Sequence, residues 1–277
     1  MYRLEREDFL RSKYIVLWSV LGFQAGFINS FAFLVGGRYV SHVTGFGTQV
    51  GFALGKDEYL FSAEFLLIPV FFIFGSFLSG LVTSARIERN LKPHYDYLML
   101  SKPLIIFVLM ILAYMGIFGD FNDPVINIEK AFFSLFLASL CGLQNGCFST
   151  MTKGQIRTTH LTGISTDLGT DLARRFFGNL SNSEKRYVNR INFCRVSTVL
   201  SFAVGAVASA LFSSSLGYAA LMVPAVLSIG IYYAVSKISR NIDLRMTDLK
   251  LSTLHQKAKQ ENSRTKTSES SEVALQF

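Results

Sequence analysis

The feature that most constrains the fold is a series of apolar segments that are long enough to cross a lipid bilayer. A helix needs about 20 apolar residues to span the hydrocarbon core. Only 17% of the 277 residues are charged, whereas about 25% is typical of a soluble protein. We therefore expect an all-α integral membrane protein with six transmembrane helices, at Tyr14–Gly36, Phe65–Ser84, Pro103–Gly119, Ala131–Met151, Val196–Phe212 and Leu216–Val235.

Along the chain, the connections between the predicted helices are alternately rich and poor in Lys and Arg. The stretches before the first predicted helix, after the second, after the fourth and after the sixth are rich in Lys and Arg. The remaining connections are poor in Lys and Arg: Gly119–Pro124 and Ser213–Gly217 contain none, and in the first connection Lys56 stands beside Asp57 and Glu58. Because basic loops stay in the cytoplasm, we expect a multi-pass protein with both termini cytoplasmic. This pattern also accounts for the net charge of +8, so no nucleic-acid partner is expected.

One short polar phrase occurs twice. "SHVTGFGTQVG" at Ser41–Gly51 and "THLTGISTDLG" at Thr159–Gly169 share Ser/Thr-His, Thr-Gly, Thr and Gly at the same spacing. Upstream, "GFQAG" at Gly22–Gly26 matches "GLQNG" at Gly142–Gly146. These matches predict an internal duplication, with repeat one at about 14–119 and repeat two at about 131–236.

Each repeat contains three predicted crossings and one apolar segment too short to span, Val43–Gly55 or Leu161–Phe177. An odd number of crossings reverses the second copy, which predicts inverted-topology repeats. Each short segment is either a re-entrant half-helix whose positive N-terminus points inward or an amphipathic helix lying at the interface. We favour the re-entrant alternative, with Thr44 and Thr162 as helix N-caps.

The composition changes near the C-terminus. We expect a transmembrane domain over 1–245 and a polar cytoplasmic tail over 246–277, largely disordered because it has little apolar content.

Polar side chains within a membrane are costly and usually face the bundle interior or a water path. The alternative is that they only join helices by hydrogen bonds. The two histidines of the repeated phrase would gate a pathway by protonation or cap the short helices, and Asp167 would carry a coupled cation or, as we prefer, pair with Arg174 and Arg175. The predicted solute-pathway residues are Gln24, Asn29, His42, Thr44, Gly45, Thr48, Gln144, Asn145, His160, Thr162, Gly163, Thr166 and Asp167.

The sequence contains no nucleophile motif, phosphate-binding loop or cluster of metal ligands. Its three cysteines, Cys141, Cys147 and Cys194, have no CxxC spacing and are predicted to be buried thiols. We therefore expect no enzymatic activity, no cofactor and no metal.

The segments "AGFINSFAFLVGGRYVSHVTGFGTQVGFALG" and "GLQNGCFSTMTKGQIRTTHLTGISTDLGTDL" resemble the bacterial YoaK family, also called DUF1275, over about Leu21–Val235. The resemblance implies a protein of the bacterial inner (plasma) membrane without an assigned function. In that family Asp is usual at the position of Asn29, and Asn is common at the position of Phe46. Both departures remove polarity from the first repeat.

These patterns favour a transporter or channel for a small polar or anionic solute, surrounded by membrane lipid. The small size of the chain favours a homodimer. The alternative is a non-transporting membrane regulator or scaffold that binds lipid or a partner protein.

Overall fold

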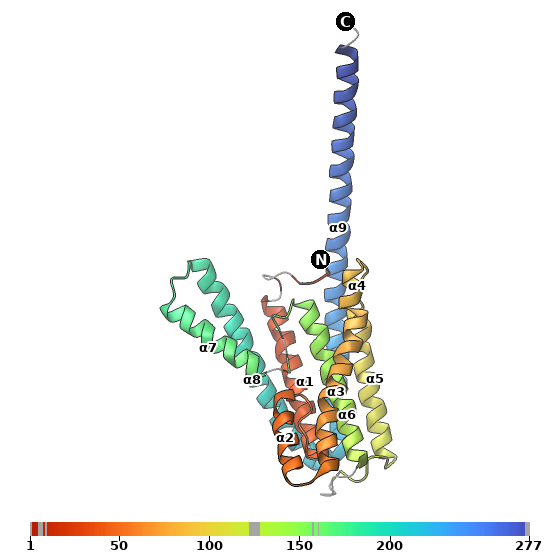
Figure 1. Ribbon diagram of the computed structural model, residues 1–277, viewed down its shortest axis with the longest axis vertical. Helices are drawn as coiled ribbons and strands as arrows, with labels where there is room; N and C mark the ends of the chain where they lie inside the picture. The colour runs from red at the N-terminus through yellow and green to blue at the C-terminus, as the bar shows by residue number, and fades with distance from the viewer. Residues whose placement is uncertain are drawn as a thin grey trace.

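The computed structural model describes residues 2–4, 8, 10–121, 128–156, 158–159 and 161–274, and all regular secondary structure in these ranges is helical. Figure 1 shows a bundle from which one long helix extends. The helices are α1 (Ser12–Gly36), α2 (Val43–Gly55), α3 (Tyr59–Val82), α4 (Ser84–Glu88), α5 (Tyr95–Tyr114), α6 (Ile128–Met151), α7 (Leu161–Phe177), α8 (Asn182–Leu216), the 3-10 helix η1 (Gly217–Leu221) and α9 (Met222–Ala274).

Five stretches of the described chain are long and apolar enough to cross a membrane: Ser12–Gly36, Phe65–Glu88, Tyr95–Tyr114, Ile128–Met151 and Asn182–Thr253. The last has 72 residues and contains both C-terminal segments that we predicted as separate spans. It is one stretch because η1 joins α8 to α9 without a polar loop, and Gly217 takes a positive φ of 53° at the junction. In Figure 1 the chain reverses there, so that α8 descends and α9 rises.

Several helix bounds differ from the prediction. α5 begins at Tyr95 rather than Pro103, because the polar residues before Pro103 interrupt the apolar run without interrupting the helix. α2 and α7 have the predicted bounds. However, His42 is the N-cap residue of α2, so the prediction that Thr44 caps this helix is wrong. α7 begins at Leu161, which likewise places Thr162 inside the helix.

Two helix pairs form the most extensive contacts of the bundle: α1 with α8, and α3 with α6. Glycines allow both pairs to approach closely. A Cβ on Gly26 of α1 would lie 2.0 Å from the carbonyl oxygen of Phe202, and one on Gly142 of α6 would lie 2.0 Å from that of Phe72. The glycine pairs of the repeated "GFQAG" and "GLQNG" motifs therefore lie at backbone-to-backbone contacts, as in other membrane helix pairs with small residues at the interface.

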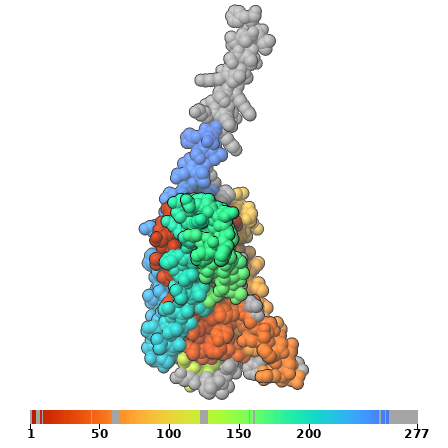
Figure 2. Space-filling model, turned by 90° about the vertical axis from the view of Figure 1, so that its left-hand side faces the viewer, coloured from red at the N-terminus to blue at the C-terminus, as the bar shows by residue number. Residues whose placement is uncertain are grey.

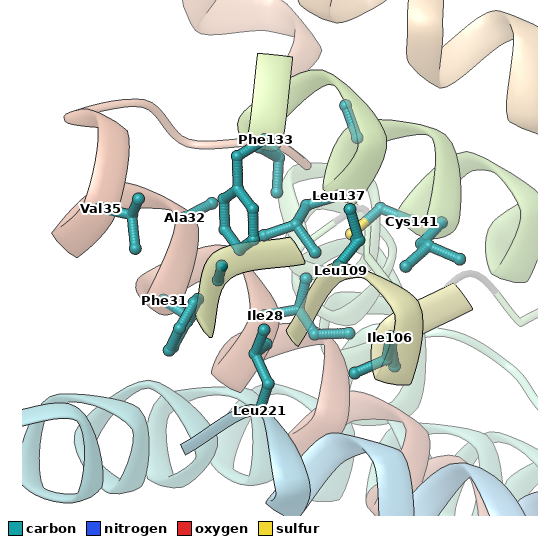
Figure 3. Close-up of a cluster of buried hydrophobic side chains, with 14 of the residues drawn as sticks. Ile28, Phe31, Ala32, Val35, Ile106, Leu109, Phe133, Leu137, Cys141 and Leu221 are labelled. Carbon is teal, nitrogen blue, oxygen red and sulfur yellow. The ribbon is translucent and has the colours of Figure 1, made fainter. Parts of the chain in front are cut away.

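The interior is filled by two apolar clusters. One packs around Trp18 and Phe148, and the other around Phe31 and Phe133, which Figure 3 shows between α1, α5 and α6. The outer surface is also apolar, with exposed side chains such as Leu104. An apolar exterior suits contact with lipid. The three cysteines are free and buried, as predicted.

The C-terminal tail, predicted from composition to be largely disordered, continues α9 as a helix to Ala274. No Gly or Pro follows Gly230, and Lys, Gln, Glu and Arg are good helix formers. The part of α9 just before the tail is anchored, because Ile238 and Ile242 are buried. Lys92 also pairs with Asp243 at 2.5 Å, and this carboxylate raises the pKa of Lys92 above its usual value.

The two short helices lie at different heights of the molecule. In Figure 1, α2 lies at the end opposite the extension of α9, whereas α7 lies towards the end from which α9 extends. Figure 2 shows the same separation from a second direction, with α7 in green above α2 in orange-red. The two copies of the repeated phrase therefore continue into helices that run towards opposite ends.

Candidate functional site

A buried lysine lies at the centre of the bundle, where it joins the two glutamines of the repeated motifs. Lys102 of α5 is 1% exposed, and its Nζ donates hydrogen bonds to Gln24 Oε1 at 2.5 Å and to Gln144 Oε1. Gln24 and Gln144 are the central residues of "GFQAG" and "GLQNG". The described residues give this ammonium no carboxylate partner, so it is a positive charge held only by neutral oxygens.

The amide nitrogens of both glutamines are also hydrogen-bonded. Gln24 Nε2 donates to the carbonyl oxygen of Pro224 at 2.7 Å and to Ser228 Oγ at 2.6 Å. Gln144 Nε2 donates to Thr158 Oγ1 at 2.9 Å and to the carbonyl oxygen of Leu21 at 3.3 Å. Because buried polar groups are costly without partners, these bonds fix both amides with their carbonyl oxygens on Lys102.

Lys102 is not among the pathway residues predicted from the sequence. The predicted third span began at Pro103 because an uninterrupted apolar segment cannot include the charged residue before it. A signal was available in the sequence: α5 contains an interior proline, Pro103, and α9 carries Pro224 in its first turn. The residue before the first is Lys102, and the residue before the second is Val223. The position of Lys102 is therefore apolar in the predicted second repeat.

A cavity of about 290 Å³ lies between the two copies of the repeated phrase, and its lining includes Asn145 and Thr159, which follow Gln144 and Thr158 in the chain. Both copies contribute their first residue to its wall, Ser41 from one and Thr159 from the other. The complete lining is Ser41, Val43, Phe72, Ser76, Asn145, Gly146, Ser149 and Thr159. We call this space the phrase cavity.

Two polar groups in the wall of the phrase cavity have no hydrogen-bond partner among the described residues. They are Thr159 Oγ1, on a residue that is 1% exposed, and Asn145 Oδ1. Native proteins satisfy the large majority of buried polar atoms. A pair of unsatisfied atoms on one cavity wall is therefore suited to hydrogen-bond a bound polar molecule. The described lining residues are all uncharged.

Asn29 positions Ser41, which lines the phrase cavity. Its Oδ1 accepts hydrogen bonds from Ser41 N at 3.0 Å and from Ser41 Oγ at 2.9 Å. The bonds hold the turn that leads into α2, and they place Ser41 against the cavity. Val43, the first residue of α2, also lines it.

We expect Asn29→Leu to destabilise the fold, because it leaves the buried backbone N–H of Ser41 without an acceptor. Such a loss costs about 1–3 kcal/mol. Asn29→Asp keeps an oxygen acceptor at the same position and is the matched control. Thermal unfolding of the detergent-purified variants measures both. Equal losses of thermal stability in the two variants would show that the side-chain oxygen does not support this turn.

The remaining sequence-predicted residues lie outside this centre or outside the described part of the chain. His42 is exposed and lies against Tyr39 and Phe202, with ring centroids 5.5 Å and 6.1 Å away. Gly45 and Thr48 are exposed on α2. His160 and the side chain of Thr44 lie outside the described residues.

Thr162 and Thr166 are exposed on α7, and Gly163 is partly exposed beside them. Asp167 also lies on α7, where it pairs with Arg195 of α8 at 3.3 Å. Asp171 pairs with the same arginine at 2.6 Å and with Arg174 at 2.9 Å. Arg175 instead donates to Asn189. These carboxylates thus join α7 to α8 and do not reach the polar centre through any contact in the described structure.

The fold and this polar centre define a membrane-type helical protein whose interior carries hydrogen-bonding groups around the buried Lys102. The chain belongs to the DUF1275 family: the family model described as "Protein of unknown function (DUF1275)" matches residues 17–234. The DUF1275 membership expected from the repeated motifs is therefore confirmed. No curated protein and no solved structure matches the chain.

Proposed function

We propose that the protein is a transporter or channel for a small polar or anionic solute, with the phrase cavity as part of the pathway. One observation carries this proposal: the corresponding first residues of both phrases, Ser41 and Thr159, line a single polar cavity. If the two repeats met only to stabilise the fold, we would expect their contact to be closely packed, without a cavity. Here the contact leaves about 290 Å³ of space and two unsatisfied polar atoms.

The proposed architecture has six crossings, α1, α3, α5, α6, α8 and α9, in two inverted repeats. α2 and α7 are then re-entrant half-helices that begin at the phrase cavity and end at opposite faces. Three features support this arrangement: the shared cavity at their starts, their separation in Figures 1 and 2, and the equivalent close crossings of α1 with α8 and of α3 with α6. Transporters built from inverted repeats place their sites at such junctions.

The electrostatics favour an anion among polar solutes. The start of a helix carries partial positive charge and unpaired N–H groups, and α2 starts at the cavity wall with Val43. The Lys102 ammonium is linked to the same wall through Gln144 and Thr158, the neighbours of Asn145 and Thr159. No described residue lining the cavity contributes an opposing negative charge.

We further propose the bacterial inner membrane as the location, with both termini cytoplasmic. The start of α1, the basic segment at α4 and the extension of α9 lie towards one end of the molecule in Figure 1. Basic segments are retained on the cytoplasmic side. In this orientation α2 opens towards the outside and α7 towards the cytoplasm.

Cysteine accessibility tests the pathway. In a chain whose three native cysteines are replaced by alanine, Ser41→Cys and Thr159→Cys place thiols on the cavity wall. We expect a small membrane-impermeant thiol reagent to reach at least one of them, and a transported solute to slow the reaction. Reaction requires water at the thiol, which a lipid-facing position lacks.

Val207→Cys is the matched control, because Val207 lies on the outer face of α8 and is 61% exposed. It should remain unreactive from both sides. If the two cavity cysteines are as unreactive as Val207→Cys from either side, the phrase cavity is a closed packing defect and the pathway proposal fails.

A second candidate function rests on α7. This helix has no buried residue, and at its C-terminal end Phe176 and Phe177 are 72% and 90% exposed beside Arg174 and Arg175. An aromatic and basic end of this kind suits an interfacial helix that binds lipid or a partner protein. A regulator of this type would tolerate filling of the phrase cavity, for example by Ser149→Leu, but would lose its activity in a Phe176→Ser, Phe177→Ser variant.

A further inference from the structure

A different cavity lies between the start of α1 and the N-terminal half of α8, and we call it the α1–α8 cavity. It measures about 440 Å³. Two arginines, two neutral polar residues and three apolar residues line it: Arg11, Arg190, Ser12, Asn189, Leu10, Ile15 and Phe193. This described lining contains cations but no carboxylate. The α1–α8 cavity is separate from the phrase cavity, with which it shares no lining residue.

The two arginines of this cavity carry more positive charge than the one neighbouring carboxylate, Asp8, offsets. Arg190 has no ion-pair partner in the described part of the chain. Arg11 contacts the carboxylate of Asp8 at 3.0 Å, but Arg245 binds that same carboxylate. Guanidinium groups are well suited to bind phosphate, because their planar N–H donors match two phosphate oxygens. The guanidinium of Arg190 is available for this, and that of Arg11 shares its carboxylate with Arg245.

The start of α1 adds to the positive potential. Arg11 is the N-cap residue and makes no side-chain cap hydrogen bond, and the first turn contains no acidic residue. Helix starts normally carry an acceptor or an acidic side chain that offsets the positive end of the helix. An anion in the adjacent α1–α8 cavity would supply this missing interaction.

The apolar part of the lining indicates where the anion comes from. Phe193 is 62% exposed on the outer face of α8, and Leu10 and Ile15 complete an apolar side. Tyr14, one residue before Ile15, marks the beginning of the apolar part of α1. Aromatic residues and arginines at the end of an apolar helix lie at headgroup level in membranes. A freely diffusing anion would gain nothing from these apolar walls, whereas a lipid would.

We propose that the α1–α8 cavity binds the phosphate headgroup of an anionic phospholipid. Arg190 and Arg11 hold the phosphate, and Leu10, Ile15 and Phe193 border the carbons next to the headgroup. Basic pockets between membrane helices bind such lipids in other proteins. The inference does not depend on the proposed transport function, since it involves a separate cavity.

Native mass spectrometry of the detergent-purified full chain, titrated with phosphatidylglycerol, tests the site. We expect Arg190→Gln to weaken phosphatidylglycerol binding by about tenfold, the effect of losing one charge-assisted hydrogen-bonding group. Arg190 is exposed, so its replacement should leave the fold intact. Arg11→Gln should weaken binding in the same direction. Arg186→Gln is the matched control, because Arg186 lies on the same exposed part of α8 but does not line the cavity.

Two further titrations identify the source of the phosphate. Tighter binding of phosphatidylglycerol than of phosphatidylcholine, weakened by Arg190→Gln and not by Arg186→Gln, supports the proposal. Equal binding of the two lipids, or equal weakening in the two variants, would overturn it by showing unspecific attraction. Glycerol 3-phosphate that binds as tightly as phosphatidylglycerol would also overturn it, by assigning the site to a soluble anion.

Discussion

Gly142→Ala should prevent the chain from accumulating as a folded protein. The added Cβ would lie 2.0 Å from the carbonyl oxygen of Phe72, on the backbone of a neighbouring helix that cannot rotate away as a side chain can. α6 and α3 would have to separate by more than about 1 Å, although interiors are packed without such slack. Overpacking of this kind costs about 1–3 kcal/mol or more. Size-exclusion chromatography of the detergent extract should show a reduced folded peak.

The equivalent crossing and two control glycines sharpen this test. Gly26→Ala should be as damaging, because its Cβ would lie 2.0 Å from the carbonyl oxygen of Phe202. Gly80→Ala and Gly230→Ala place the same methyl group on helices where no atom lies within 4 Å. These controls should fold as well as the wild type or better, since Ala favours helix over Gly. Four variants of equal stability would contradict the close approach of α3 with α6 and of α1 with α8.

Lys102→Met should reduce anion passage by about thirtyfold while leaving the bundle folded. Under the proposed function, the ammonium attracts an anion in the phrase cavity. For an anion bound about 8 Å from the ammonium, an effective dielectric constant of about 20 gives an attraction of about 2 kcal/mol, or about thirtyfold in anion occupancy. Flux of a panel of small anions into proteoliposomes containing purified protein measures the loss.

The effect of Lys102→Met on stability is expected to be small, because two contributions oppose each other. The substitution leaves two buried amide oxygens, on Gln24 and Gln144, without a donor. It also removes the desolvation cost of an ammonium that is 1% exposed. Lys102→Arg, which keeps the charge, is the control for flux. A Lys102→Met protein that folds and conducts anions at the wild-type rate would exclude Lys102 from the pathway.

The Lys102→Met and Gly142→Ala variants test different properties of the protein. Loss of flux in Lys102→Met together with a normal elution profile separates chemistry from folding, whereas Gly142→Ala tests folding alone. If no anion passes in any variant or in the wild type, the regulator alternative gains support, and the exposed end of α7 at Phe176 and Phe177 becomes the surface to test.

Much of the architecture could be predicted from local sequence patterns. Apolar runs specify membrane helices because lipid demands that every backbone group be bonded within the helix. The bounds of α2 and α7 followed from short apolar segments between polar turns, and the repeated glycines marked the positions where helices now cross. These properties depend on neighbouring residues in the chain, so they can be read without knowing what packs against them.

The tertiary structure alone decided which polar groups meet. Lys102 appeared to lie just outside a span, yet α5 extends past it, and the bundle places its ammonium between two glutamines that are far apart in the chain. Thr159 and Ser41 come together around the phrase cavity, while Asp167 and Thr48, equally prominent in the repeated phrases, face outward. Whether a buried polar residue bonds to a neighbour or is left facing a cavity depends on how helices from both halves of the chain pack. That packing is a long-range property, which periodicity and composition do not encode.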